Sequence, residues 1–353
     1  MARRCEGGRR AAVTFVTELD WRMLMARADV GFAVIGLGMG RSRSKMIAET
    51  PGARVAVVCD LNEERAKVVA QELNVPYTLD HHEALARKDV EVVLVMTPTG
   101  AHAPVAIDAA SAGKHVVTTK PLEVTVERCD QVIRACDEAG VVLAVDFGSR
   151  YAQDMQTVKR AIEEGKLGKL ILGEATLKWY RSQAYYDAGG WRGTWAMDGG
   201  GSLMNQSIHP IDLLLWFLGG AKRVMGTAGI FAHRMETEDL GMALVEFASG
   251  AVGRILGTTT YPDSQPFEVN VHGDRGGVVT RDGAIAAWHF LEGAKDTAIE
   301  PGTGPANIVA DMVGVLRHNG KPVVDGREGR RSVELIQAIY QSARETRWVN
   351  LPL

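Results

Sequence analysis

The chain lacks the features that mark membrane proteins and nucleic-acid-binding proteins. No apolar run approaches the roughly 18 residues that a membrane helix needs. The 40 Lys and Arg residues are outnumbered by 43 Asp and Glu, so the formal charge is −3 and no basic excess remains for a phosphate backbone. We therefore expect a small molecule as partner, and neither a nucleic acid nor a membrane.

Cysteine is scarce as well. The four cysteines form no Cys-x-x-Cys pair and have no histidine at zinc-ligand spacing; they are Cys5, Cys59, Cys129 and Cys136. Isolated cysteines of this kind are typical of small apolar side chains buried in a protein of a reducing compartment. We expect a cytoplasmic protein without a bound metal.

The first 28 residues differ from the rest. Several arginines precede a short apolar stretch over 11–16, as at the start of an export signal. Glu18 and Asp20 end that stretch early, and no cleavage site follows. Residues 1–28 are therefore interpreted as a loosely ordered extension, or the biological start lies at Met23 or Met25.

The remaining length is sufficient for two domains, and 46% hydrophobic content indicates a sizeable core. In the first part, Val- and Ile-rich runs alternate with stretches of helical spacing. The predicted strands cover 30–35, 55–59, 92–96, 115–118 and 141–147, and the predicted helices 41–49, 62–73, 102–112 and 124–139. This alternation predicts an α/β domain over 29–149, with a doubly wound parallel sheet of the Rossmann type.

From about residue 150 the pattern changes to longer, alternating strands separated by glycines, which favours an antiparallel sheet. The predicted strands cover 170–180, 223–231, 241–247, 252–260, 268–272 and 285–290, and the predicted helices 154–164, 208–218, 306–317 and 329–346. Residues 150–353 are thus predicted to form an α+β substrate-binding domain, with the boundary within 147–151.

A glycine-rich turn follows the first predicted strand and opens a helix. Gly36 permits a tight turn, Gly38 lets the backbone approach a pyrophosphate, and the helix start after Met39 and Gly40 offers unpaired N–H groups to phosphates. The usual pattern has its third glycine where this chain has Arg41. Either the helix packs differently on the strand, or Arg41 itself reaches the pyrophosphate.

Asp60 ends the second predicted strand, 24 positions after Gly36. Its carboxylate can accept hydrogen bonds from the ribose hydroxyls of NAD and would repel the 2′-phosphate of NADP, so we expect NAD rather than NADP. Asp60 can also cap the helix that begins near Asn62, and the two roles can coexist.

With further motifs in view, the chain resembles the glucose–fructose oxidoreductase/inositol dehydrogenase/MocA family of NAD(P)-dependent sugar dehydrogenases from about residue 30 onward. Beyond the glycine turn, the resemblance rests on an ordered set of segments at 97–102 (TPTGAH), 119–121 (TKP), 191–192 (WR) and 199–212 (GGGSLMNQSIHPID). It implies a second domain with a large open sheet, and further cofactor contacts from Thr97, Pro98, Thr99, His102, Thr119 and Lys120.

The resemblance also implies the catalytic residues. The family's lysine before proline faces nicotinamide and substrate, and here it is Lys120, although Thr119 replaces the usual glutamate. The family's Asp four residues before His is Asn205 before His209. Residues four apart share a helical face, but Pro210 cannot donate to the carbonyl of Gln206 and is expected to kink a helix here.

The chemistry of alcohol oxidation gives these residues roles. Hydride leaves carbon only as the hydroxyl proton leaves, so a base must lie within roughly 3 Å of that oxygen. His209 is the expected base, and Lys120 is expected to stabilise the developing alkoxide. Neutral Asn205 can orient the ring or bind substrate but supplies no charge, so we expect a less basic His209 than in relatives with Asp.

An aromatic and basic cluster over 178–195 is expected to bind the sugar, because aromatic faces stack on sugar rings while Arg and Lys bind hydroxyls or anions. With the catalytic residues, the expected substrate-binding set is Lys120, Arg150, Lys178, Tyr180, Trp191, Arg192, Asn205 and His209.

Three functions remain open. The first is NAD-dependent oxidation of a secondary hydroxyl, at carbon 3 by resemblance, of a sugar, glycoside or sugar nucleotide. The second is redox-assisted glycoside cleavage, which needs the same Lys and His. The third is a non-catalytic NAD-binding regulator, which could dispense with both. The family's open sheet further implies a homodimer or homotetramer.

Overall fold

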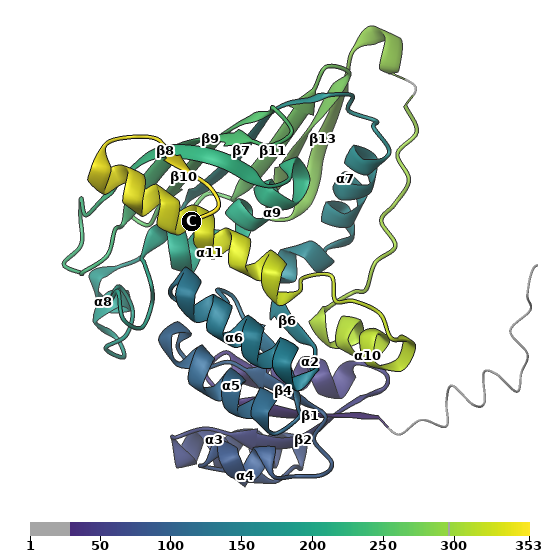
Figure 1. Cartoon of the computed structure of the whole chain (residues 1–353), viewed down its shortest axis with the longest axis vertical. Coiled ribbons are helices and arrows are strands. Elements are labelled where there is room, and N and C mark those ends of the chain that lie inside the picture. Colours follow the sequence, from purple (N-terminus) through teal and green to yellow (C-terminus); the bar gives the residue numbers. More distant parts are fainter. Residues whose placement is uncertain (1–28, 296) are drawn as a thin grey trace, which may run out of the picture.

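The computed structural model describes residues 29–295 and 297–353, which form two sheets joined at a helical junction (Figure 1). The extension 1–28, with Cys5, lies outside the described residues. Cys59, Cys129 and Cys136 are buried free thiols, as the sequence predicted.

The first part of the chain builds a six-stranded sheet in the order β3-β2-β1-β4-β5-β6, with every pair parallel. The strands are β1 (Val30–Ile35), β2 (Ala53–Cys59), β3 (Tyr77–Thr78), β4 (Val92–Val95), β5 (His115–Thr119) and β6 (Leu143–Asp146). The helices are α2 (Gly40–Glu49), α3 (Glu63–Leu73), α4 (His81–Leu85), α5 (His102–Ser111) and α6 (Val126–Ala139). This is the strand order of the Rossmann fold. Strands β2 and β3 extend the sheet to one side of β1, and β4 to β6 extend it to the other side, so the order of addition reverses between β1 and β4.

The predicted parallel sheet of the Rossmann type is confirmed, with two elements not predicted. Neither β3 nor α4 was predicted, because a two-residue strand and a five-residue helix are too short to show a period. The predicted strands and helices otherwise agree with the structure to within two residues at most ends.

The second part of the chain builds an eight-stranded sheet in the order β13-β12-β11-β7-β10-β9-β8-β14. Its strands are β7 (Leu170–Lys178), β8 (Ala221–Gly229), β9 (Leu240–Phe247), β10 (Val252–Thr258), β11 (Glu268–Gly273), β12 (Gly276–Arg281), β13 (Ala284–Phe290) and β14 (Val349–Asn350). All neighbours are antiparallel except β7 and β10. The mainly antiparallel sheet was predicted; β12 and β14 were not.

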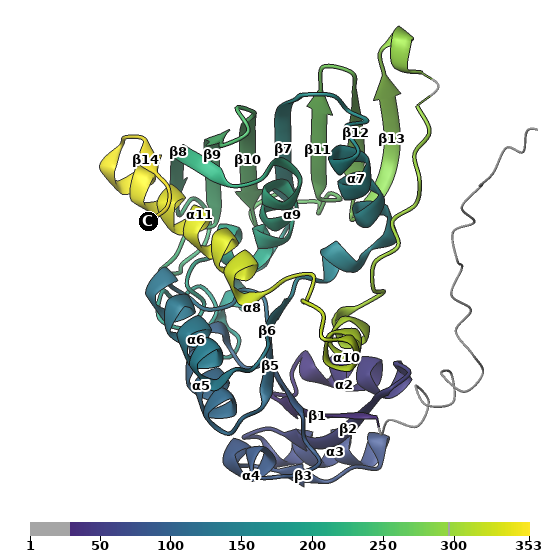
Figure 2. The ribbon, with the colours of Figure 1, turned by 45° about the vertical axis from the view of Figure 1, so that its right-hand side comes forward.

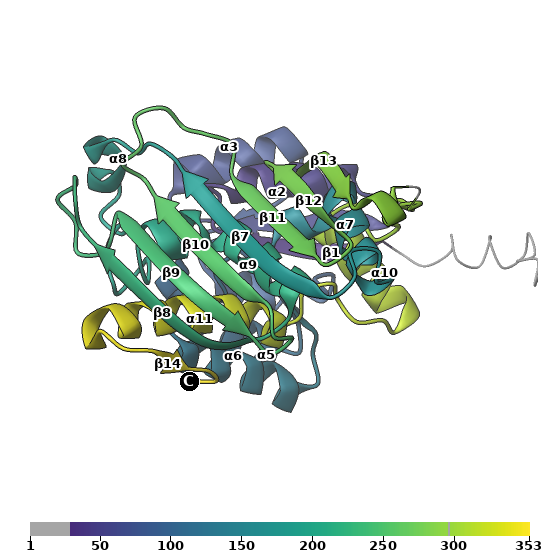
Figure 3. The same cartoon turned by 90° about the horizontal axis from the view of Figure 1, so that it is seen from above.

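Helices cover one face of this sheet and leave the other open. The helices of this part of the chain are α7 (Gln153–Glu163), α8 (Gln183–Asp187), α9 (Ile208–Leu218), α10 (Ile308–His318) and α11 (Gly326–Glu345), of which α7, α9 and α11 pack on this sheet. In Figures 2 and 3, α9 and α11 lie against one face of the sheet, and no helix of the described chain covers the other. The alternation in β9, where Ala243 and Val245 are buried but Met242 and Leu244 are exposed, agrees with one solvent-facing side.

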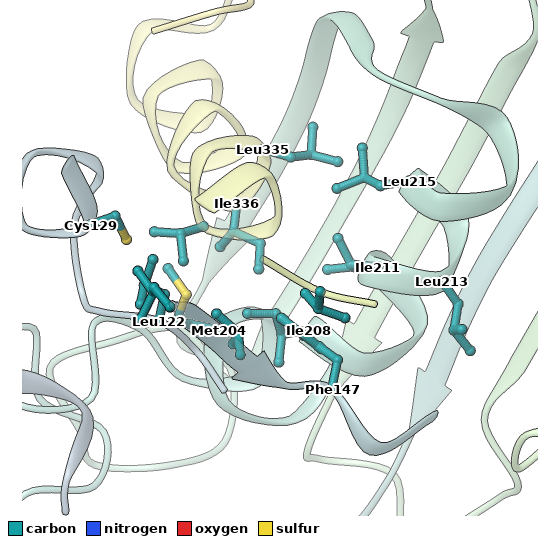
Figure 4. Close-up of a cluster of buried hydrophobic side chains, with 14 of the residues drawn as sticks. Leu122, Cys129, Phe147, Met204, Ile208, Ile211, Leu213, Leu215, Leu335 and Ile336 are labelled. Carbon is teal, nitrogen blue, oxygen red and sulfur yellow. The ribbon is translucent and has the colours of Figure 1, made fainter. Parts of the chain in front are cut away.

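A continuous apolar core crosses the junction between the two sheets. Figure 4 shows Leu122 and Phe147 from the first domain beside Met204 and Ile208 from the second, with Ile336 of α11 against them. Burial of this shared surface fixes the carboxyl ends of the parallel strands against the start of α9.

Helix α10 belongs to the first domain by its packing, although it lies late in the sequence. Ile308 and Met312 are buried with Val30 and Val92 of the parallel sheet. The chain after α10 also returns to β6, where the Val145 N–H donates to the Val324 carbonyl at 3.0 Å. The second part of the sequence therefore completes the first domain.

Candidate active site

The turn after β1 has the shape that a bound dinucleotide requires. Gly36 has φ +92°, and a Cβ there would lie 2.8 Å from backbone atoms of Met96. A Cβ at Gly38 would meet no atom within 4 Å, so the space beside it is open. The first glycine thus makes the turn, and the second leaves room for a pyrophosphate.

The start of α2 bears on the altered glycine pattern at Arg41. Gly40 packs closely on the strand, since a Cβ there would lie 3.1 Å from Val34 and 3.4 Å from Met96. Gly40 therefore does the packing normally done by the third glycine. Arg41, which is half-exposed, forms an ion pair with Glu72 of α3; the close packing of Gly40 favours the first explanation of the altered pattern, and an Arg41 contact to the pyrophosphate stays a prediction.

Asp60 lies where the strand and the glycine turn meet. Its carboxylate accepts hydrogen bonds from the N–H groups of Leu37 at 2.7 Å and Asn62 at 2.8 Å, and it pairs with Arg65 at 3.1 Å. The helix cap of α3 is Asn62, whose side chain accepts from the Arg65 N–H. Asp60 therefore shapes the turn, and it is not the cap.

These residues fit a nicotinamide dinucleotide. Helix α2 begins without a side-chain cap, which leaves its first N–H groups available to phosphate. The buried Thr97 hydroxyl at the end of β4 has no hydrogen-bond partner among the described residues. The residues that would hold the cofactor are therefore Gly36, Gly38, Met39, Gly40, Asp60, Thr97, Pro98 and Thr99.

His102, which the resemblance predicts as a cofactor contact, bridges two loops of the first domain. It is fully buried, and its ring nitrogens contact the carbonyl oxygens of Thr97 at 2.9 Å, Pro121 at 3.0 Å and Leu122 at 3.2 Å. The ring therefore ties the loop after β4 to the loop after β5. It holds the segment that carries Lys120.

Lys120 follows β5, at the carboxyl edge of the parallel sheet. Its ammonium donates to the Asn205 carbonyl at 2.7 Å, which joins the two domains. Burial lowers the pKa of Lys120 to about 8, although Asp198 and Asp146 oppose that shift by favouring the charged form. Lys120 is therefore a half-buried cation whose pKa lies well below that of an exposed lysine.

Asn205 and His209 lie on two successive helices. Asn205 belongs to a π-helical turn, Ser202–Gln206, and His209 to the first turn of α9. The kink expected from Pro210 does not occur, because α9 begins at Ile208 and Pro210 lies in its first turn, where no intrahelical N–H is needed.

His209 is half-buried, lies within reach of the charge of Lys120 and packs edge-on against Phe147 at 6.4 Å between ring centroids. Its Nδ1 has no hydrogen-bond partner among the described residues. Burial, followed by the charges of Lys120 and Arg43, lowers the pKa of His209 to about 3. The imidazole is therefore neutral and free to bind a hydroxyl group.

Asp198 is a site residue that the sequence reasoning missed. Its side chain is buried and contacts the amide nitrogen of Asn205, and burial raises its pKa to about 6. A lone Asp before a glycine run resembles a turn residue. Its nearness to Lys120 depends on tertiary structure.

The aromatic cluster is built around two arginines. Arg192 stacks on Trp191 at 4.7 Å and on Tyr185 at 4.8 Å, measured from the guanidinium carbon to the ring centroids. Arg181 lies over Trp179 and Tyr185 and donates to the side chain of Gln206, next to Asn205, at 2.8 Å. The cluster therefore adjoins the Lys120 site, and it carries cations and aromatic faces suited to a sugar derivative.

Three residues predicted to bind substrate either lie away from Lys120 or are held in an ion pair. Arg150 is 1% exposed and is bound to Asp212 at 2.7 Å and to Glu328 at 3.2 Å, so it is a structural ion pair. Lys178 shares the open face of the sheet with Thr176, because the intervening Leu177 is buried. Tyr180 is half-exposed beyond the end of β7, and no described contact links it to Lys120.

One surface group outside this site has the makeup of a metal site. The ligand atoms of Asp80, His81 and His82 at the start of α4 lie within 4.8 Å of one another. His81 also contacts Asp108 at 3.0 Å. None of these residues contacts the Lys120 site.

A Rossmann domain with an acidic residue after β2, joined to a half-buried lysine and imidazole, defines a nicotinamide-dependent oxidoreductase. Family comparison agrees: residues 30–147 match the oxidoreductase family with an NAD-binding Rossmann fold, and 155–279 match the GFO/IDH/MocA C-terminal domain. The chain belongs to the GFO/IDH/MocA family of NAD-dependent sugar oxidoreductases. The resemblance drawn from the sequence is confirmed.

Three relatives illustrate the range of this family. The crystal structure of WlbA dehydrogenase from Bordetella pertussis, in complex with NADH and UDP-GlcNAcA, is 32% identical with a TM-score of 0.84, covering 93% of this chain and 99% of that one. Scyllo-inositol 2-dehydrogenase (NAD(+)) of Bacillus subtilis is 29% identical, covering 71% of this chain and 73% of its own. Alpha-N-acetylgalactosaminidase of Shewanella oneidensis is 31% identical, covering 52% of this chain and 43% of its own.

Among the helices of the described residues, none is both long enough and apolar enough to cross a bilayer.

Proposed function

We propose that this enzyme transfers hydride between NAD and a secondary hydroxyl, at carbon 3, of a sugar nucleotide. The observation that carries the proposal is the meeting of Lys120 and His209, 89 positions apart in sequence, at the carboxyl edge of the parallel sheet. Similarity to WlbA dehydrogenase over nearly the whole chain, together with the arginine–aromatic cluster, supports a sugar nucleotide as substrate.

Bound NAD supplies the hydride acceptor, and the residues of this chain manage the proton. A base works best when its pKa lies near the operating pH. Because the pKa of Lys120 is about 8 and that of His209 about 3, Lys120 is the better proton acceptor. We therefore propose roles opposite to those expected from the sequence: neutral Lys120 takes the hydroxyl proton, and neutral His209 orients the hydroxyl.

A screen of NAD reduction across sugars, glycosides and UDP-sugars, including UDP-GlcNAcA, tests this function. We expect NAD reduction with one class of compound, and we expect that activity to be lost in Lys120→Ala. Lys178→Ala is the matched control, because that lysine lies on the open face of the sheet and should leave kcat/KM unchanged. Turnover that survives in Lys120→Ala would refute the assignment.

A second candidate function is redox-assisted glycoside cleavage. It is favoured by the 31% identity to alpha-N-acetylgalactosaminidase, although the match spans about half of each chain. In this reaction, transient oxidation of the sugar activates it toward elimination and uses the same lysine and histidine. Release of an aglycone from a chromogenic glycoside, without net NADH formation, would favour it over simple oxidation.

We also propose that NAD is preferred over NADP. The support is the charge of Asp60 at the end of β2, which disfavours a 2′-phosphate. Arg65 beside Asp60 partly offsets this charge, so the preference should be finite and measurable as a ratio of kcat/KM values.

The open face of the eight-stranded sheet supports assembly into a homodimer or homotetramer. Met225, Met242, Leu244 and Val252 are exposed on neighbouring strands there, and exposed apolar patches of this kind mark contact surfaces. The same face carries a hollow of about 480 Å³ beside His272 and His289. A monomer in light scattering would contradict this proposal.

A further inference from the structure

The strongest unassigned feature of the site is the buried carboxylate of Asp198. It lies in the loop between α8 and the π-helical turn and is 2% exposed. One carboxylate oxygen accepts from the Gly193 N–H at 2.9 Å, and the other contacts the amide nitrogen of Asn205. Both partners are neutral, so the charge of this carboxylate has no ion-pair partner in direct contact among the described residues.

Asp146, the other carboxylate that acts on Lys120, differs in this respect. It is bound by the Arg43 guanidinium at 2.6 Å, so a cation in direct contact already balances its charge. The backbone carbonyl of Asn205 accepts from the Lys120 ammonium at 2.7 Å, while its side chain contacts Asp198. A single residue therefore links the carboxylate to the ammonium.

We propose that Asp198 is a positioning residue that supplies, beside Lys120, the negative charge that the neutral Asn205 cannot, and that it sets the pH at which Lys120 loses its proton. Asp198 does this by holding the Asn205 amide and by its field on the ammonium. The inference rests on the proposed function only where it concerns turnover.

The charged and titratable groups around this pair are consistent with the assignment. Asp198 is the largest influence that keeps Lys120 charged against burial, and it raises the pKa of Lys120. Arg181 acts on Lys120 in the opposite direction, and His209 is neutral. Arg192 acts on Asp198. The pKa of the buried Tyr340 hydroxyl is raised by burial first, then by Glu238, and to a smaller extent by Asp198.

The hydrogen bonds around Asn205 allow the negative charge to be moved from residue 198 to residue 205. Its amide oxygen accepts from Gln206 at 2.9 Å, which fixes the amide nitrogen toward Asp198. In the double variant Asp198→Asn/Asn205→Asp, the new amide at 198 can accept from the Gly193 N–H and donate to the new carboxylate. That carboxylate can still accept from Gln206, so the network is retained with the charge relocated.

The experiment measures the protonation of Lys120 directly. The full chain is labelled with carbon-13 at lysine Cε, its Lys120 signal is assigned by its absence in Lys120→Arg, and the signal is titrated by NMR. Asp198→Asn should lower the midpoint by about one pH unit, because an opposite charge nearby favours the protonated amine. The double variant should restore the midpoint toward that of the wild type. Asp29→Asn, exposed at the opposite edge of the parallel sheet, should not move it.

Two results would overturn the proposal: an unchanged midpoint in folded Asp198→Asn, or a double variant that titrates like the single one. NADH binding and thermal melting report whether each variant is folded. If Asp198→Asn does not fold, the double variant decides alone, because it keeps the charge and should titrate near the wild-type midpoint. Since the titration needs no substrate, a failure of the proposed sugar oxidation would not change the measured midpoints.

Discussion

The pH dependence of hydride transfer separates the two candidate bases. Burial lowers the pKa of Lys120 to about 8 and that of His209 to about 3. A base acts only in its unprotonated form, so kcat/KM for oxidation must follow the neutral fraction of whichever residue accepts the proton. With Lys120 as base, activity falls as the pH drops through its pKa. With His209 as base, activity is flat across the neutral range.

The size of the effect follows from the two pKa values. The neutral fraction of an amine with a pKa of about 8 is about one half at pH 8 and about one hundredth at pH 6, so kcat/KM should fall about 50-fold between those values. A histidine with a pKa of about 3 is neutral throughout that range, so its contribution to the profile is constant.

The assay is steady-state NAD reduction with a fixed sugar substrate, and kcat/KM is plotted against pH. Stability over the same range is checked by melting. His209→Asn should lower the whole profile without moving its midpoint, because that variant removes a hydroxyl contact and not the base. A wild-type profile that changes less than about threefold between pH 6 and pH 8 would refute Lys120 as the base.

Three further predictions concern the scaffold and the cofactor. Gly36→Ala should destabilise the first domain by more than about 1 kcal/mol in denaturant unfolding, because the new Cβ would lie 2.8 Å from Met96 and the backbone φ is +92°. Gly38→Ala has open space around its Cβ, so it should fold normally but bind NADH more weakly in a fluorescence titration. Asp212→Ala should cost about 3–5 kcal/mol of unfolding free energy, because it leaves the buried Arg150 guanidinium underpaired, and an unchanged melting temperature would contradict this. Asp60→Ser should lower the ratio of kcat/KM with NAD to that with NADP by at least about tenfold, and a ratio like the wild type would show that Asp60 does not discriminate.

The fold was predictable because its signals are local. Strands such as Val30–Ile35 and helices such as Ile208–Leu218 have the same bounds in the prediction and the structure. Short elements such as Tyr77–Thr78 gave no periodic signal. The packing of α10 on the first domain was also missed, because apolar spacing marks the buried face of a helix but not the surface that covers it.

The site was predictable only where a motif carried the information. Gly36, Asp60 and Lys120 were singled out through the motifs that contain them, and the structure places them at the carboxyl edge of the parallel sheet. Arg150 was misassigned because its partner Asp212 is 62 positions away, and an arginine that completes a buried ion pair has no local pattern to show it. Asp198 was missed for the same reason, since its relation to Lys120 is formed across the domain junction.

The apolar core that runs from Phe147 through Ile208 to Ile336 also bears on how the enzyme can be built and moved. A hinge opening between the two domains would expose this shared apolar core to water. Access for sugar and dinucleotide must therefore come from rearrangement of loops while the two domains keep their relative positions. A chain cut near residue 150 should yield two insoluble fragments. Heating the intact protein should melt both sheets together in a single calorimetric peak.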